Sequence, residues 1–326
     1  MALVVTVGLA VVAGLAVLSL AIGSRDLGIA ETWRGLVHRD GTAASIIVHE
    51  LRLPRTVLAV VVGAALAVAG VVMQALTRNP LAEPGILGVN AGASFAVVLA
   101  IALFGVTGVS GYLWFAFAGA AGAAVLVYAM AQRRDVHAGP TRLVLAGVAL
   151  GASLSAVTGV VTMYRTSAFS SYRYWVIGSF DGRDAGVLTW VAPFLLGGLV
   201  LALGSAHTLN ALSLGDEQAA ALGARVARAR TAAFVAITLL CGGATAAAGP
   251  ISFVGLVVPH AVRLLVGVDQ RRVLACSLVA GPALVLAADI VGRVIDRPGE
   301  IEVGVVTAFV GAPLLLALVV RGRNVR

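Results

Sequence analysis

The chain is divided into long apolar runs, and one of them extends from Thr56 to Thr77 without a charged residue. A run of this length can cross a bilayer as a helix. Lipid offers no partner to backbone polar groups, so such a segment must satisfy its own backbone as a helix. Of the 326 residues, 60% are hydrophobic and 12% are charged, whereas a soluble domain averages about 25% charged residues. The sequence therefore predicts an all-α polytopic membrane protein.

Similar runs recur along the chain, and at about 20 residues per span we expect about ten transmembrane helices. They are residues 2–22, 56–77, 86–104, 112–131, 143–163, 187–204, 231–249, 251–268, 273–291 and 303–320. The run at 251–268 contains Pro259 and Arg263, and because proline removes a backbone donor we expect a kinked or interrupted helix there. Residues 25–53 are expected to form a polar loop. The spans form one transmembrane domain, residues 1–326, with a further polar loop at about 205–229.

The formal net charge of +8 comes from arginines that lie mainly at the ends of apolar runs. They form no basic stripe, which argues against nucleic acid as a partner. Cytoplasmic loops of membrane proteins carry an excess of basic residues. An even number of spans puts both termini on one side, and placing them in the cytoplasm leaves more arginines inside than outside. We therefore expect a multi-pass protein of the cytoplasmic (inner) membrane, with both termini and the 205–229 loop in the cytoplasm.

The chain contains no lysine, since all 23 of its basic residues are arginine. A P-loop needs a lysine to reach the nucleotide phosphates. If ATP drives the function of this chain, another polypeptide must hydrolyse it. We expect neither enzymatic activity, nor a metal site, nor a bound cofactor in this chain.

A pattern of small residues occurs twice, at residues 63–70 and 242–249, and at the same offset Pro80 matches Pro259. Five crossings separate the two copies, so they run in opposite directions, as in the inverted-topology repeats of transporters. Chance similarity in a chain rich in alanine and glycine is the alternative. We expect two five-helix halves. Small residues let helices approach closely in lipid, and the candidates are Gly63, Gly70, Gly242 and Gly249.

Two stretches resemble a known family. Residues 52–93, with Leu51 before them, carry L-R-L-P-R before the second span and R-N-P-L after it, and residues 249–263 read G-P-I-S-F-V-G-L-V-V-P-H-A-V-R. They resemble the FecCD family of ABC importer permeases, which move iron–siderophores, haem and vitamin B12. The resemblance covers residues 52–320. It implies a permease that pairs with a second copy or with a paralogous permease, and that works with two ATPase subunits and an extracytoplasmic binding protein.

The loop at 205–229 contains the pattern G-D-E-x-A-x-x-L-G, which resembles the family's coupling helix, seated in a groove of the ATPase. Asp216 is suited to cap a short helix, and Glu217 to the positive N-terminal end of that helix. An ordinary interfacial helix is the alternative. The resemblance implies coupling contacts at Gly215, Asp216, Glu217, Ala220, Leu222 and Gly223, the last of which can end the helix.

Four arginines are candidates for docking the binding protein. The resemblance implies this role for Arg52 and Arg55, where Pro54 is expected to hold Leu53 extended and to start a helix. The alternative is contact with lipid phosphates. Between these two roles the choice stays open for Arg293 and Arg297.

Polar side chains at membrane depth are further candidates, because they are costly there. The resemblance places Asn79, Pro80 and Leu81 at a cytoplasmic gate, and Gln74 lies late in the same span. His260 and Asp289 lie in later spans. For Asp289 a structural role, bonded to a neighbouring helix, is the favoured interpretation.

The predicted function is the permease subunit of an ABC importer for an iron–siderophore, with haem or cobalamin as alternative substrates. A rival hypothesis is a secondary transporter coupled to protons, with His260 and Asp289 as the relay. Another is a structural or receptor membrane protein that transports nothing.

Overall fold

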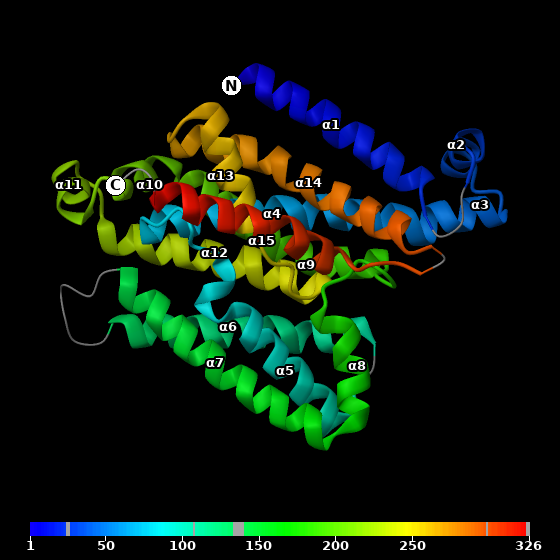
Figure 1. Cartoon of the computed structure of the whole chain (residues 1–326), viewed down its shortest axis with the longest axis horizontal. Helices are drawn as coiled ribbons and strands as arrows, with labels where there is room; N and C mark the ends of the chain where they lie inside the picture. The colour runs from blue at the N-terminus through cyan, green and yellow to red at the C-terminus, as the bar shows by residue number, and fades with distance from the viewer. Residues whose placement is uncertain (24–26, 107, 133–139, 298, 324–326) are drawn as a thin grey trace.

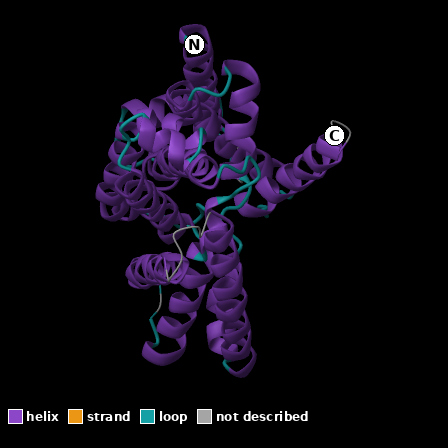
Figure 2. Cartoon of the chain, turned by 90° about the vertical axis from the view of Figure 1, so that its left-hand side faces the viewer, coloured by secondary structure: helices purple, strands orange, loops and turns teal. Residues whose placement is uncertain are grey.

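The computed structural model describes residues 1–23, 27–106, 108–132, 140–297 and 299–323. Within these ranges every regular element is a helix (Figure 2). Ten of the helices correspond to the predicted spans. They are α1 (Ala2–Ala21), α4 (Leu53–Thr77), α5 (Val89–Phe104), α6 (Val109–Gln132), α7 (Pro140–Tyr164), α9 (Ala185–Gly204), α12 (Val226–Ala248), α13 (Val254–Val266), α14 (Gln270–Ile295) and α15 (Val303–Arg323).

Seven helices in the described part of the chain are long and apolar enough to cross a membrane by length and composition. Shorter apolar helices are α5, α13 and the described part of α15. The expected interruption at Pro259 is not seen, because α13 is a continuous helix of 13 residues that runs through both Pro259 and Arg263. Phe253, just before this helix, adopts the left-handed backbone region with φ of +69°. The all-helical, polytopic fold is therefore confirmed.

The expectation of a plain polar loop at 25–53 is wrong. This segment contains α2 (Ile29–Val37), α3 (Ala43–Ile46) and the π-helix η1 (Ile47–Arg52), which continues directly into α4. Leu53 is helical, with φ −65° and ψ −50°, and not extended before Pro54. In an α-helix the proline ring clashes with the carbonyl group four residues earlier, and the wider i→i+5 turn of the π-helix leaves more room at that place.

Helix α4 lies at the centre of the bundle and packs against α14, α12, α13 and α9 (Figure 1). Two of its glycines permit close approach. A Cβ atom added at Gly63 would lie 2.8 Å from the carbonyl oxygen of Gly281 in α14, and one added at Gly70 would lie 2.0 Å from that of Gly255 in α13. The small-residue face predicted for this helix therefore packs backbone against backbone.

The second copy of the small-residue pattern repeats this packing at one of its two glycines, since a Cβ at Gly249 would lie 2.2 Å from the carbonyl oxygen of Trp175. A Cβ at Gly242 would make an ordinary 3.4 Å contact with Ala120. Gly249 lies beyond the end of α12 with φ of +77°, where its lack of a side chain permits the turn. The predicted match of Pro80 with Pro259 is wrong, because Pro80 lies in a turn whereas Pro259 lies inside a helix.

The neighbours of α4 and α12 nevertheless correspond, because each of these helices packs on two helices from the other half of the chain. Helix α4 packs on α13 and α14, and its counterpart α12 packs on α5 and α6. Helices α5, α6 and α7 pack together, as do α13, α14 and α15. Helices α4 and α12 are antiparallel, since Arg55 and Ala248 contact the same loop at 177–184, whereas Arg78 and Arg230 contact the same aspartate.

The predicted site residues lie mainly at two ends of the bundle. The Arg55 end holds Arg55, α2, α3, the loop at 177–184 and residues 299–302 before α15. The α11 end holds α10 (Ala206–Ser213), α11 (Asp216–Ala221) and the turn after α4. Helix α1 begins and α15 ends toward the α11 end (Figure 1). Helix α8 (Thr166–Val176) connects α7 to the loop at 177–184. The assignment of residues 1–326 to one domain stays a prediction.

Candidate functional site

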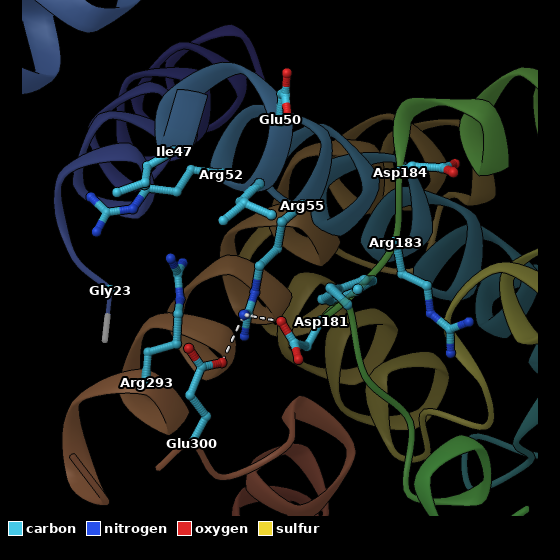
Figure 3. Close-up of a pocket in the computed structure, with 13 residues that line it drawn as sticks. Gly23, Ile47, Glu50, Arg52, Arg55, Asp181, Arg183, Asp184, Arg293 and Glu300 are labelled. Atoms are coloured by element: carbon cyan, nitrogen blue, oxygen red, sulfur yellow. Dashed lines mark hydrogen bonds and ion pairs between the residues drawn. The ribbon is translucent and has the colours of Figure 1, made fainter. Parts of the chain in front are cut away.

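Arg55, in the first turns of α4, is the centre of an ion-pair network (Figure 3). Its Nη2 donates to Oδ1 of Asp289 in α14 at 2.9 Å. Its Nη1 donates to Oε2 of Glu300, before α15, at 2.7 Å, and lies 3.7 Å from Oδ1 of Asp181, before α9. One side chain thus links α4 to α14 and to both loops of this end.

Arg52 and Arg293 bond the carbonyl groups at the end of α1. Arg52 donates to the carbonyl oxygens of Leu20 and Ala21, both at 2.7 Å. Arg293 donates to the carbonyl oxygens of Ser19 at 2.9 Å and of Ile22 at 2.8 Å. Nη2 of Arg293 also lies 2.8 Å from Oδ2 of Asp289. The last carbonyls of a helix have no donor within it, and the two arginines supply donors.

Arg52, Arg55 and Arg293 are buried and bonded within this chain, and their role in docking the binding protein stays a prediction. Their exposed fractions are 5%, 7% and 2%. A buried charge is costly unless it is paired and hydrogen-bonded, and these three are satisfied within the chain. Asp289 is 1% exposed and bonded between two helices, as its structural interpretation predicted. Arg297, the remaining candidate, is exposed.

A cavity of about 280 Å³ lies beside this network. The cavity is lined by both arginines and carboxylates. The arginines are buried, whereas the carboxylates of Glu50, Asp181 and Asp184 are exposed. The surface that this cavity offers to solvent is therefore acidic.

At the α11 end, the predicted short helix is present as α11. Its cap differs from the prediction, because Gly215 occupies the N-cap with φ of +111° and Asp216 is the first helical residue. The Asp216 carboxylate instead bonds Arg230 of α12, at 2.6 Å. Gly223 ends the segment in the left-handed region, as predicted. Glu217, Ala220 and Leu222 are exposed along α11 and at its end.

Asn210 of α10 holds the start of α14 beside this helix. Its Nδ2 donates to Asp269 at 3.0 Å, and its Oδ1 accepts from the backbone N–H of Gln270 at 2.8 Å. The hydrogen bond from Asn210, followed by one from the Arg271 backbone, keeps the pKa of Asp269 below its usual range. Sequence analysis of the 205–229 loop did not identify Asn210, because its partners Asp269 and Gln270 lie about sixty residues away in the chain.

The turn predicted as a gate follows α4. Asn79 accepts the backbone N–H of Leu81 on its Oδ1 at 2.9 Å, so the side chain closes the turn. Asn79 and Pro80 are exposed. Gln74, by contrast, is buried and tied to α13, where it donates to the Gly255 carbonyl and accepts from Arg263. Gln74 therefore fixes a helix contact and does not face an open pathway.

A second cavity, of about 670 Å³, lies between α5, α7 and α8. Its described lining is uncharged and consists largely of glycine, alanine and side chains with hydroxyl groups. The hydroxyl-bearing residues are Ser94, Ser155, Thr158, Thr162, Tyr172 and Ser252. Sequence reasoning did not identify this site. The sequence feature that could have indicated this cavity is a row of small and hydroxyl-bearing residues along one face of α7, namely Gly147, Gly151, Ser155, Thr158 and Thr162.

No group of three or more metal-ligating side chains occurs in the described ranges. That this chain binds no cofactor stays a prediction.

Residues 9–321 match the FecCD transport family. The chain belongs to this family. It is 48% identical over 305 residues to the ferric enterobactin transport system permease protein of Escherichia coli (strain K12), covering 93% of this chain and 91% of that protein. It is 40% identical over 324 residues to the Fe(3+) dicitrate transport system permease protein of the same organism, covering 99% of each.

A solved structure has the same fold. It is an inward-facing conformation of a metal-chelate type ABC transporter, with a TM-score of 0.86 and 30% sequence identity, covering 98% of this chain and 100% of that one. This FecCD protein is a multi-pass membrane permease subunit of an ABC importer and is not itself the catalytic subunit.

Proposed function

We propose that this permease carries an iron–siderophore complex across the cytoplasmic membrane, driven by ATP that a separate subunit hydrolyses. The observation that carries the proposal is the 48% identity to the ferric enterobactin permease. The Fe(3+)-citrate import permease of Bacillus subtilis (strain 168) is 41% identical over 309 residues, covering 95% of this chain and 92% of that protein. A vitamin B12 permease of Yersinia enterocolitica is 42% identical over 293 residues, covering 86% and 84%, so cobalamin is the second candidate substrate.

The assembly that we propose has two permeases, two ATPase subunits at the α11 end and a binding protein at the Arg55 end. The α11 end would face the cytoplasm together with both termini. The exposed arginines of this end, Arg225, Arg228, Arg271 and Arg272, support that orientation. Exposed Glu217, Ala220 and Leu222 support α11 as the ATPase contact.

The translocation pathway that we propose runs along the second cavity, between two permease copies. Helix α7 leaves most of its span unburied, and α15 extends away from the bundle (Figure 2). Phe309 and Leu316 of α15 are 77% and 67% exposed. A second copy or a paralogue would cover these apolar faces. The uncharged, hydroxyl-lined wall would let a large chelate pass without a strong binding site.

The test is reconstitution of the permease with its ATPase in liposomes, with binding protein and ferric siderophore outside. We expect uptake of radioactive iron that requires ATP inside and the binding protein. A Glu217→Arg/Ala220→Arg variant should lose uptake because the charged, bulky face no longer fits the ATPase groove. Uptake of cyanocobalamin in preference to the ferric chelate would identify the second candidate substrate.

The proton-coupled rival receives no support from the site. The described contacts of Asp289 are with Arg55 and Arg293, and not with His260. In the same liposomes, uptake that persisted without ATP and collapsed on addition of an uncoupler would overturn the ABC assignment.

A further inference from the structure

Asp216 joins three helices at the α11 end through its two carboxylate oxygens. Oδ2 accepts from Arg230 of α12 at 2.6 Å. Oδ1 lies 3.7 Å from Nη2 of Arg78, the residue that follows α4. Because each oxygen faces a different arginine, the first residue of α11 is attached to α12 on one side and to the end of α4 on the other.

The backbone around this contact is held in unusual conformations. Arg78 has φ of +51°, one of two positive values among the described residues other than glycine. Such a conformation costs about 1 kcal/mol or more for a residue with a side chain and persists only where the surroundings hold it. Gly215 has φ of +111°, and a Cβ atom there would lie 3.5 Å from Nη1 of Arg78. The guanidinium group of Arg78 therefore reaches directly over the start of α11.

Helix α4 is well suited to transmit a displacement that reaches Arg78. Its span is the most completely buried of the seven long ones. Near its end, Gln74 is bonded to Gly255 and Arg263 of α13, and Asn79 closes the turn that follows. A shift of Arg78 must move either this turn or α4 with its packed neighbours, because a close-packed interior does not deform locally.

We propose that the Arg78–Asp216 ion pair is the positioning contact that ties movement of α11 to the end of α4. This inference rests on the proposed function, in which an ATPase subunit moves α11. Asp216 would then transmit the displacement to Arg78, and Arg78 to the turn at 79–81 and to α4. Arg230 anchors Asp216 on α12 and sets the orientation of its second oxygen.

The experiment measures iron taken up per ATP hydrolysed in the reconstituted complex. Arg78→Gln and Asp216→Asn should each lower this ratio by about fivefold, the upper range for a part-exposed ion pair. Asp216→Asn also weakens the contact with Arg230, so the double variant should lose no more than Asp216→Asn alone, because the Arg78 contact is already removed there. Arg78→Lys keeps the charge and should retain most of the ratio. In 1 M salt the wild-type ratio should fall toward that of Arg78→Gln, since salt screens exposed pairs.

A purely structural role would give a different pattern. The matched control is Arg228→Gln, which removes an exposed arginine of the same end that has no described partner. It should leave the ratio unchanged. The inference is overturned if Arg78→Gln keeps the wild-type ratio, or if the losses of the two single variants multiply in the double variant. A wild-type complex that hydrolyses ATP without taking up the chelate would overturn the proposed function, and this inference with it.

Discussion

At the scale of single residues, the main finding is that the conspicuous arginines of the Arg55 end are internal contacts. Nη2 of Arg55 bonds Oδ1 of Asp289, and Nη2 of Arg293 bonds Oδ2 of the same carboxylate. Each group alone would be an unpaired charge in a buried position, and together they hold the ends of α1, α4 and α14. The local sequence shows their charge but not these partners.

We predict that Asp289→Asn destabilises the fold by about 3–5 kcal/mol, because it leaves two buried guanidinium groups without their shared counter-ion. Thermal unfolding of the purified protein in detergent measures this. Glu50→Gln, at an exposed position of the same end, should change the midpoint little. Equal midpoints for the two variants would show that the network adds nothing to stability.

At the scale of elements, the close crossings of α4 depend on glycine. Gly70 and Gly255 bring the backbones of α4 and α13 together, and Gly63 does the same with α14. Since lipid provides no hydrophobic force between helices, such contacts supply much of the attraction through close packing.

We predict that Gly70→Ala destabilises the protein by about 1–3 kcal/mol through overpacking, since its new Cβ would lie 2.0 Å from a carbonyl oxygen. The control is Gly14→Ala in α1, where an added Cβ meets nothing within 4 Å. That change should be neutral, or stabilising by about 0.5–1 kcal/mol from helix propensity. Unfolding midpoints of both variants test the prediction, and a Gly70→Ala protein as stable as wild type would refute the close crossing.

At the scale of the whole molecule, the two ends differ in what they expose. The Arg55 end surrounds its cavity with exposed carboxylates, whereas the α11 end exposes several arginines, and α1 begins and α15 ends toward it. This difference supports the proposed orientation, in which the α11 end faces the cytoplasm.

Labelling with a membrane-impermeant maleimide tests that orientation. Glu50→Cys should react in intact spheroplasts, and Glu217→Cys only after the membrane is permeabilised. The two native cysteines, Cys241 and Cys276, are buried and should give little background. The reverse pattern would invert the protein in the membrane and exclude α11 as the contact with a cytoplasmic ATPase.

Much of the fold follows from the sequence, because a transmembrane span is a local property. An apolar run of sufficient length must form a helix in lipid whatever surrounds it. The ten runs and the short helix ended by Gly223 were predictable for this reason. Membership of the FecCD family was also readable from two stretches of sequence.

The roles of the charged residues were decided by the tertiary structure. Arg55 and Asp289 are 234 residues apart in the chain, and no local pattern indicates that one neutralises the other. The same holds for Asp216, which satisfies the sequence rule for a cap but lies between two arginines from other helices. The charge of a side chain is fixed by its type, whereas its exposure and its partner depend on how distant helices pack.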